Sequence, residues 1–144
     1  MTPQPDFIVM ARDTPEVVMV VEVKQLGLNL DEAERQLKTY MLHNHSPLGM
    51  LVTPESLRLY HDEYRGTREA SIERIAEFST PEVLGASQWR KTGARLEEMV
   101  RRWLEGVVDN WWSNLPKIPS IRRQLLEHLV PSLTEGRVMS GTVR

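Results

Sequence analysis

The segment VVMVVEVKQ at residues 17–25 restricts the fold of this 144-residue chain more than any other. Its β-branched residues favour a buried strand. Because residues i and i+2 of a strand share a face, Glu22 and Lys24 point one way while Val21 and Val23 point the other. A charge within an apolar strand is costly unless it is paired or bound to a metal. Either the end of this strand is exposed, or the two charges have a function.

The residues before this strand predict its partner. FIVM at 7–10 is a second strand candidate, and ARDTPE at 11–16 contains the turn-forming residues Asp13 and Pro15. Two strands joined by so short a turn predict a β-hairpin over residues 7–23.

The hairpin brings three charged side chains to one end. Asp6 precedes its first strand and Glu22 closes its second, so the two carboxylates converge with Lys24 beside them. Oxygen ligands of this kind suit Mg²⁺, which takes one or two carboxylates and keeps several waters. An adjacent lysine can orient or deprotonate an attacking water, or neutralise charge that develops on a phosphate.

The next segments predict a strand–helix–strand unit. Apolar residues recur at helical spacing over 31–44, and Asn29 or Asp31 can cap that helix. Residues 49–53 and 57–64 read as two further strands, whereas 65–78 suits either a strand or a short helix. A helix between two strands is long enough for a parallel crossover.

The back of the chain is predicted to be helical. A stripe of Trp, Leu and Val residues predicts one long helix over about 86–114, LPKIP breaks it, and 119–134 forms a second helix. The last ten residues, 135–144, read as a loose tail. We therefore expect two parts, an α/β core at 1–78 and a helical extension at 79–144.

Four features follow one another in the sequence: Pro5-Asp6, a turn, Glu22-Val23-Lys24 and Gln36-Leu-Lys-Thr-Tyr40. This ordered set resembles the PD-(D/E)XK nuclease superfamily, in particular RecB-like nucleases and the nuclease domains of type I restriction subunits. The resemblance covers about residues 5–64 and implies a restriction-endonuclease-like mixed sheet with a flanking helix. It also implies hydrolysis of phosphodiester bonds in DNA with Mg²⁺ or Mn²⁺.

The resemblance also implies roles for single residues. Asp6 and Glu22 would be metal ligands together with the Val23 carbonyl, and Lys24 would be the catalytic lysine. Gln36 and Tyr40, which share one helix face, would position DNA or the site itself.

The chain departs from this family at its start. The family core begins with a helix, often bearing a further acidic ligand, and a strand before the Pro-Asp strand, yet only four residues precede Pro5. We expect the helix at 86–114 to cover the vacant sheet face. The helix would come from the same chain, from the twofold mate in a homodimer, or from another partner chain. Its acidic residues would then be candidates for the missing ligand: Glu97, Glu98 and Glu105.

Charge and composition leave two function classes open. Residues 1–86 carry a formal charge of −6 and residues 87–144 carry +4, so the back half can contact phosphate. Its tryptophans predict core or interface packing, or base stacking assisted by Arg90, Lys91 and Arg95. The chain is expected to be a Mg²⁺-dependent nuclease or, as the alternative, a nuclease-like binding or assembly module without catalysis.

Other classes are disfavoured. The chain has no cysteine, which excludes disulfides and thiolate zinc sites, and its four histidines lack metal-ligand spacing. The absence of a long apolar run and of signal-peptide character predicts a cytoplasmic protein without membrane spans.

Overall fold

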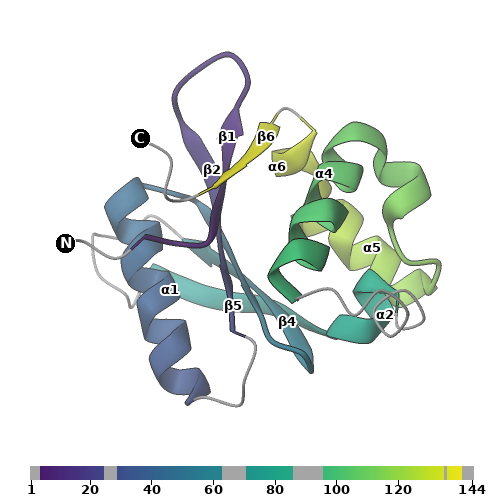
Figure 1. The fold of residues 1–144 in the computed structure, drawn as a ribbon, viewed down its shortest axis with the longest axis horizontal. Helices are drawn as coiled ribbons and strands as arrows, with labels where there is room; N and C mark the ends of the chain where they lie inside the picture. The colour runs from purple at the N-terminus through teal and green to yellow at the C-terminus, as the bar shows by residue number, and fades with distance from the viewer. Residues whose placement is uncertain (1–3, 25–28, 63–70, 86–95, 135, 141–144) are drawn as a thin grey trace.

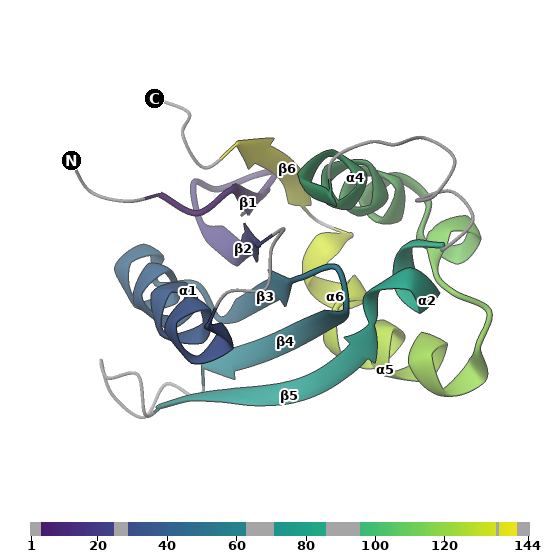
Figure 2. The ribbon, with the colours of Figure 1, turned by 60° about the horizontal axis from the view of Figure 1, so that its bottom comes forward.

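The computed structural model describes residues 4–24, 29–62, 71–85, 96–134 and 136–140. These residues form a mixed sheet of six strands in the order β5-β4-β3-β2-β1-β6, with helices on both faces (Figure 1 and Figure 2). The predicted α/β class is confirmed. The strands are β1 Phe7–Ala11, β2 Val17–Val23, β3 Leu48–Val52, β4 Ser56–Asp62, β5 Ile72–Ser79 and β6 Gly136–Ser140.

The predicted hairpin and crossover are both present. β1 pairs antiparallel with β2, and Phe7 lies opposite Val21. β2 then pairs in parallel with β3, so the chain must cross the sheet between them, and α1 (Leu30–Asn44) makes that crossing. The Asn29 side chain caps α1 by accepting hydrogen bonds from the backbone N–H groups of Asp31 and Glu32.

Alternation along the strands gives the sheet two different faces. The face beneath α1 holds a small buried cluster, which contains Val20, Ala33, Leu37, Tyr40, Met41, Leu51, Tyr60 and Ile72. The opposite face holds the larger cluster, in which Val9, Met19, Val21 and Val23 share a core with the remaining helices. Glu22 lies on the α1 face because its neighbours in β2 point to the other side.

The large cluster is closed by helices from the back of the chain. They are α2 Thr80–Leu84, α4 Leu96–Asn114, α5 Pro119–His128 and α6 Val130–Leu133. Met99, Val100, Trp103, Leu104 and Val107 of α4 belong to the same core as β1 and β2. The expectation that this helix covers the sheet is therefore confirmed for the described part, and the cover comes from the same chain.

Two predictions for the helical segment change in detail. The helix expected at 86–114 is seen from Leu96, residues 86–95 lying outside the described ranges, and it has a kink at Asn110. The helix expected at 119–134 is two helices, α5 and α6, separated at Leu129. Pro131 explains the break, because it lacks the N–H group that a continuous helix would direct to Glu127.

The prediction of a loose tail at 135–144 is wrong for residues 136–140. They form β6, which pairs antiparallel with β1 and places Gly136 opposite Ala11. A Cβ at Gly136 would lie 2.7 Å from Val9 Cγ1, so the close approach of the two strands requires glycine there. The tail has little strand signal of its own, and the open hydrogen-bonding edge of β1 supplies the partner that the sequence does not show.

Candidate functional site

Asp6 and Glu22 are joined where the hairpin ends. The backbone N–H of Asp6 donates to Glu22 Oε1 at 3.2 Å, and the backbone N–H of Val23 donates to Asp6 Oδ2 at 2.7 Å. Each acidic residue thus binds the main chain of the other strand, which holds both carboxylates at fixed positions. The contact seen at Val23 is made by its N–H group, and the role of its carbonyl as a ligand remains a prediction.

Lys24 completes this cluster. Its Nζ lies 3.2 Å from Glu22 Oε2, and the Glu22 side chain is only 3% exposed while that of Lys24 is 26% exposed. The backbone N–H of Lys24 donates to the Val52 carbonyl, so β3 holds the residue just after the end of β2. The two charges of the VVMVVEVKQ segment therefore form one ion pair whose carboxylate is buried and whose ammonium reaches solvent.

Burial shifts the ionisation of Glu22. Loss of solvent raises its pKa to about 7, assisted by the hydrogen bond to the Asp6 side chain and repulsion from the Asp6 charge, while Lys24 acts in the opposite direction. The two carboxyl groups are therefore close enough to compete for ionisation. A cation that neutralised both carboxylates would relieve this repulsion and so stabilise the site.

The helix motif lies near the site, because the charges of Glu22 and Asp6 act on the Tyr40 hydroxyl. Burial raises the pKa of the Tyr40 hydroxyl, and the negative charges of Glu22 and Asp6 raise it further. The phenol thus stays protonated near the pair. Gln36 lies one helical turn earlier on the same face.

Gln36 lines a hollow that the sequence did not predict. The hollow has a volume of about 470 Å³ and is lined by Lys24, Asn29, Glu32, Ala33 and Gln36. Glu32, Gln36 and Tyr40 follow one another at i, i+4 and i+8, so they form a row along one side of α1. The sequence shows this spacing, but Asn29 and Glu32 match no binding motif and are typical of an ordinary helix start.

The other predicted site residues either lie outside the described ranges or are placed away from this cluster. Arg90, Lys91 and Arg95 lie outside the described residues. Glu98 and Glu105 pair with Arg101 on the exposed side of α4, at 2.7 and 3.2 Å. Within the described ranges, no group of three or more His, Asp or Glu side chains is placed to hold a metal ion. Because α4 packs on the face of the sheet opposite α1, its acidic residues do not join the Asp6–Glu22 cluster.

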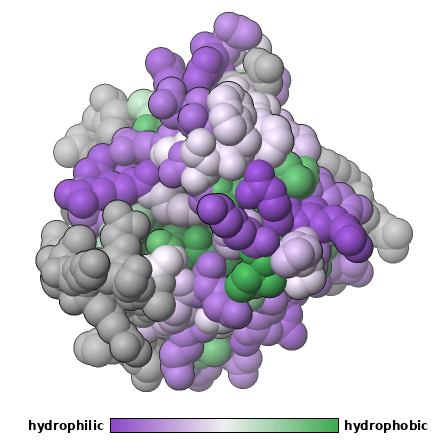
Figure 3. Space-filling model, turned by 90° about the vertical axis from the view of Figure 1, so that its right-hand side faces the viewer, coloured by the Kyte–Doolittle hydropathy of each residue, from purple (hydrophilic) through white to green (hydrophobic). Residues whose placement is uncertain are grey.

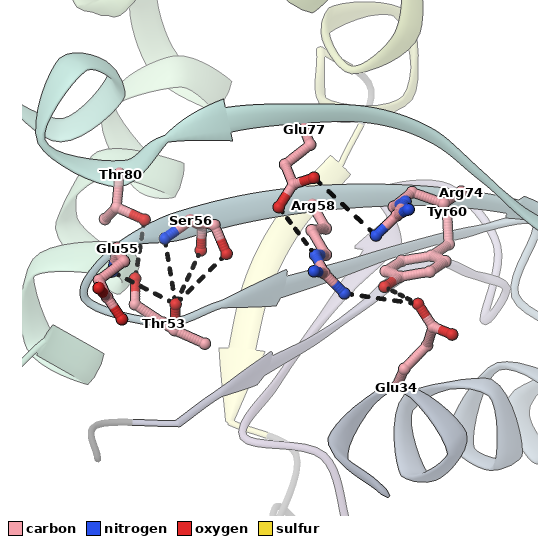
Figure 4. A network of polar contacts seen from close by, with 9 residues as sticks. All are labelled: Glu34, Thr53, Glu55, Ser56, Arg58, Tyr60, Arg74, Glu77 and Thr80. Atoms are coloured by element: carbon pink, nitrogen blue, oxygen red, sulfur yellow. Dashed lines mark hydrogen bonds and ion pairs between the residues drawn. The ribbon is translucent and has the colours of Figure 1, made fainter. Parts of the chain in front are cut away.

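A second polar network on the α1 face involves Glu34 and Tyr60 (Figure 4). The buried Tyr60 hydroxyl donates to Glu34 Oε2, and Arg58 lies 3.7 Å from the same oxygen. Arg58 Nε also donates to Glu77 at 3.0 Å, which links α1 to β4 and β5. These groups satisfy one another across three elements, so we assign the network to packing of α1 against the sheet.

No family model, curated protein or solved structure matches this chain. Among the residues that the structure describes, no helix has both the length and the apolar character needed to span a membrane.

Proposed function

We propose that the chain is a Mg²⁺-dependent nuclease that hydrolyses phosphodiester bonds, with DNA as the expected substrate. The observation that carries the proposal is the cluster of Asp6, Glu22 and Lys24 at one end of the hairpin. Its two carboxyl groups are hydrogen-bonded to each other, and the lysine ammonium pairs with Glu22 at 3.2 Å while still reaching solvent. This combination agrees with the roles implied by the resemblance of Pro5-Asp6 and Glu22-Val23-Lys24 to PD-(D/E)XK nucleases.

The donor set fits a hard divalent cation. Asp6 and Glu22 offer only oxygen ligands, and Mg²⁺ is commonly held by one or two carboxylates plus substrate phosphate and waters. The pKa of Glu22 is raised to about 7 by its burial and then by the neighbouring Asp6 carboxyl group, and a cation would relieve the repulsion between the two acids. When bound, Mg²⁺ supplies Lewis-acid stabilisation of the charge that develops on the phosphate.

The protein's own groups have separate tasks in this proposal. Asp6 and Glu22 hold the cation, and the backbone N–H of Val23 fixes the Asp6 carboxylate through its 2.7 Å hydrogen bond. The Lys24 ammonium orients the attacking water and stabilises the phosphate charge. The Tyr40 hydroxyl stays protonated near the carboxylate pair and would help to position the DNA or the pair.

The direct test is cleavage of labelled single-stranded and duplex DNA with Mg²⁺. Lys24→Ala should lower the rate by about 10²-fold or more, because one positioned charge or proton-transfer group contributes on this order. Lys38→Ala is the matched control, since Lys38 also pairs with a glutamate, at 3.7 Å from Glu34, but lies outside the cluster. Cleavage that survives both EDTA and Lys24→Ala would overturn the proposal.

Thermal unfolding tests the metal site without relying on activity. Mg²⁺ should raise the melting temperature of the wild type by mass action, since it binds the folded state. Glu22→Gln should weaken that response, whereas Glu16→Gln in the exposed β1–β2 turn should retain it. A wild-type melting temperature that does not respond to millimolar Mg²⁺ would show that Asp6 and Glu22 form no useful metal site.

A second candidate is a non-catalytic assembly module, because two large apolar side chains are exposed near the end of α4. Trp112 is 60% exposed and Ile118 is 40% exposed. Figure 3, which faces the side formed by α2, α4 and α5, shows small separate hydrophobic areas within a polar surface. Light scattering of the wild type and of Trp112→Ser tests this candidate. A concentration-dependent dimer that Trp112→Ser dissociates would support it, and a monomer at all concentrations would exclude self-assembly.

A further inference from the structure

The hollow beside Lys24 has the size of a small-ligand site and adjoins the carboxylate pair. Its volume of about 470 Å³ falls within the range of roughly 300 to 1,000 Å³ typical of small-molecule pockets. Lys24 lines the hollow and also pairs with Glu22, so a group bound there lies next to the proposed cation.

The lining of the hollow offers both hydrogen-bond donors and acceptors. Asn29 uses its side-chain oxygen to cap α1, so its NH₂ group is the part left to donate. Gln36 can donate and accept, and the Glu32 carboxylate can only accept. Ala33 contributes an apolar surface between them.

These groups disfavour a phosphate in the hollow itself. An anion there would face the Glu32 carboxylate, and the one cation of the described lining, Lys24, is already paired with Glu22 at 3.2 Å. A neutral group with donors and acceptors on its edge meets no such repulsion. A nucleobase is a group of this kind, and the adjacent phosphate would then lie near Lys24.

We propose that the hollow receives the unpaired base of the nucleotide next to the hydrolysed phosphate, an inference that rests on the proposed nuclease function. A base inside a duplex is stacked and its edge is paired, so the bound strand must be single or locally opened. Glu32 accepts a hydrogen bond from the exocyclic amino group of adenine or cytosine, and thymine presents an oxygen instead. The site therefore selects single strands and disfavours thymine at that position.

The test uses single-stranded oligo(dA), oligo(dC) and oligo(dT), with affinity measured without metal and cleavage rate measured with Mg²⁺. Wild type should prefer oligo(dC) and oligo(dA) to oligo(dT) by about tenfold, the scale of one good base contact. Glu32→Gln should bring this ratio close to one, because an amide can also donate to the thymine oxygen. Intrinsic differences among the oligonucleotides cancel when the ratio is compared between variant and wild type.

Asp31→Asn is the matched control, because it removes a carboxylate from the same helical turn while Asp31 does not line the hollow. It should retain the wild-type preference. Duplexes of the same sequences should bind and react more weakly than the single strands.

The outcomes separate this inference from the proposed function. Cleavage with no base preference, or a preference that Glu32→Gln leaves unchanged, overturns the base-binding role and leaves the nuclease proposal standing. Binding with the expected preference but without cleavage supports the base site and rejects the nuclease proposal. Absence of both binding and cleavage rejects the two together.

Discussion

The two faces of the sheet are built from the same strands but have different chemistry. On the face covered by α4, α5 and α6, β1 and β2 contribute only apolar residues, among them Val9, Met19 and Val21, to the larger core. On the α1 face the apolar cluster is smaller, and Asp6 and Glu22 occupy the end of the hairpin. One face is therefore built for packing, while the other holds charges.

This difference shows how the chain accommodates a buried charge. Glu22 is 3% exposed, yet its carboxylate accepts the Asp6 N–H and pairs with Lys24. Among the described residues, no buried side-chain nitrogen or oxygen lacks a hydrogen-bond partner. The apolar face supplies burial that holds the strands in place, and the polar face can then keep ionisable groups close together.

The largest expected effect comes from placing a charge on the packing face. Trp103 is buried in α4, and its indole N–H donates to the Asn114 carbonyl at 3.1 Å. Trp103→Asp should unfold the protein, because an unpaired buried charge costs more than a marginally stable fold can supply. Trp112→Asp on the same helix should change stability by less than about 0.5 kcal/mol, since Trp112 is 60% exposed. Circular dichroism distinguishes the two, and a native spectrum for Trp103→Asp would contradict the packing role of α4.

A smaller effect is expected from the charge on the polar face. The pKa of Glu22 is raised from 4.5 to about 7 in the folded state, so folding favours the protonated form. Its contribution to the free energy of unfolding is complete below pH 4.5 and is lost as the pH rises to about 7, a change of about 3 kcal/mol.

Glu22→Gln should remove this pH dependence. Urea unfolding in EDTA at about pH 5 and about pH 8 measures it, and the variant should be more stable than wild type at the higher pH. Glu16→Gln, in the exposed turn, should follow the wild type. An equal pH dependence in Glu22→Gln and wild type would show that another group is responsible.

The smallest effect concerns the network that attaches α1 to the sheet. Tyr60→Phe removes the hydrogen bond to Glu34 and should destabilise the protein by about 1 to 2 kcal/mol, since Glu34 is partly solvated and keeps Arg58. A double-mutant cycle with Glu34→Gln isolates the pair. A coupling energy near zero would show that the contact contributes nothing to stability.

Much of the local structure could be predicted from residue patterns. Three local patterns predicted structure that the fold contains. They are the β-branched run at 17–23, the turn residues Asp13 and Pro15, and the helical spacing over 31–44. The convergence of Asp6 and Glu22 also followed from the hairpin, because equal distances from a turn place two residues side by side.

The rest depended on contacts between distant segments. β6 has a weak strand pattern and exists because β1 offers an open edge, so the tail at 136–140 could not be predicted from its own residues. Of the ambiguous segment 65–78, residues 65–70 lie outside the described ranges and residues 72–78 belong to β5, whose pairing with β4 favours a strand over a helix. Strand formation of this kind reflects partners far along the chain and not local preference.

The sequence by itself determined which side chains reach the end of the hairpin, since the turn and the alternation of β2 place Asp6, Glu22 and Lys24 together. Only the tertiary structure decided their chemistry. α1 and the sheet remove water from Glu22 and raise its pKa to about 7, and the start of α1 encloses the hollow beside Lys24. Ionisation and cavity shape depend on the surrounding dielectric and on neighbours from other segments, and a linear pattern carries neither.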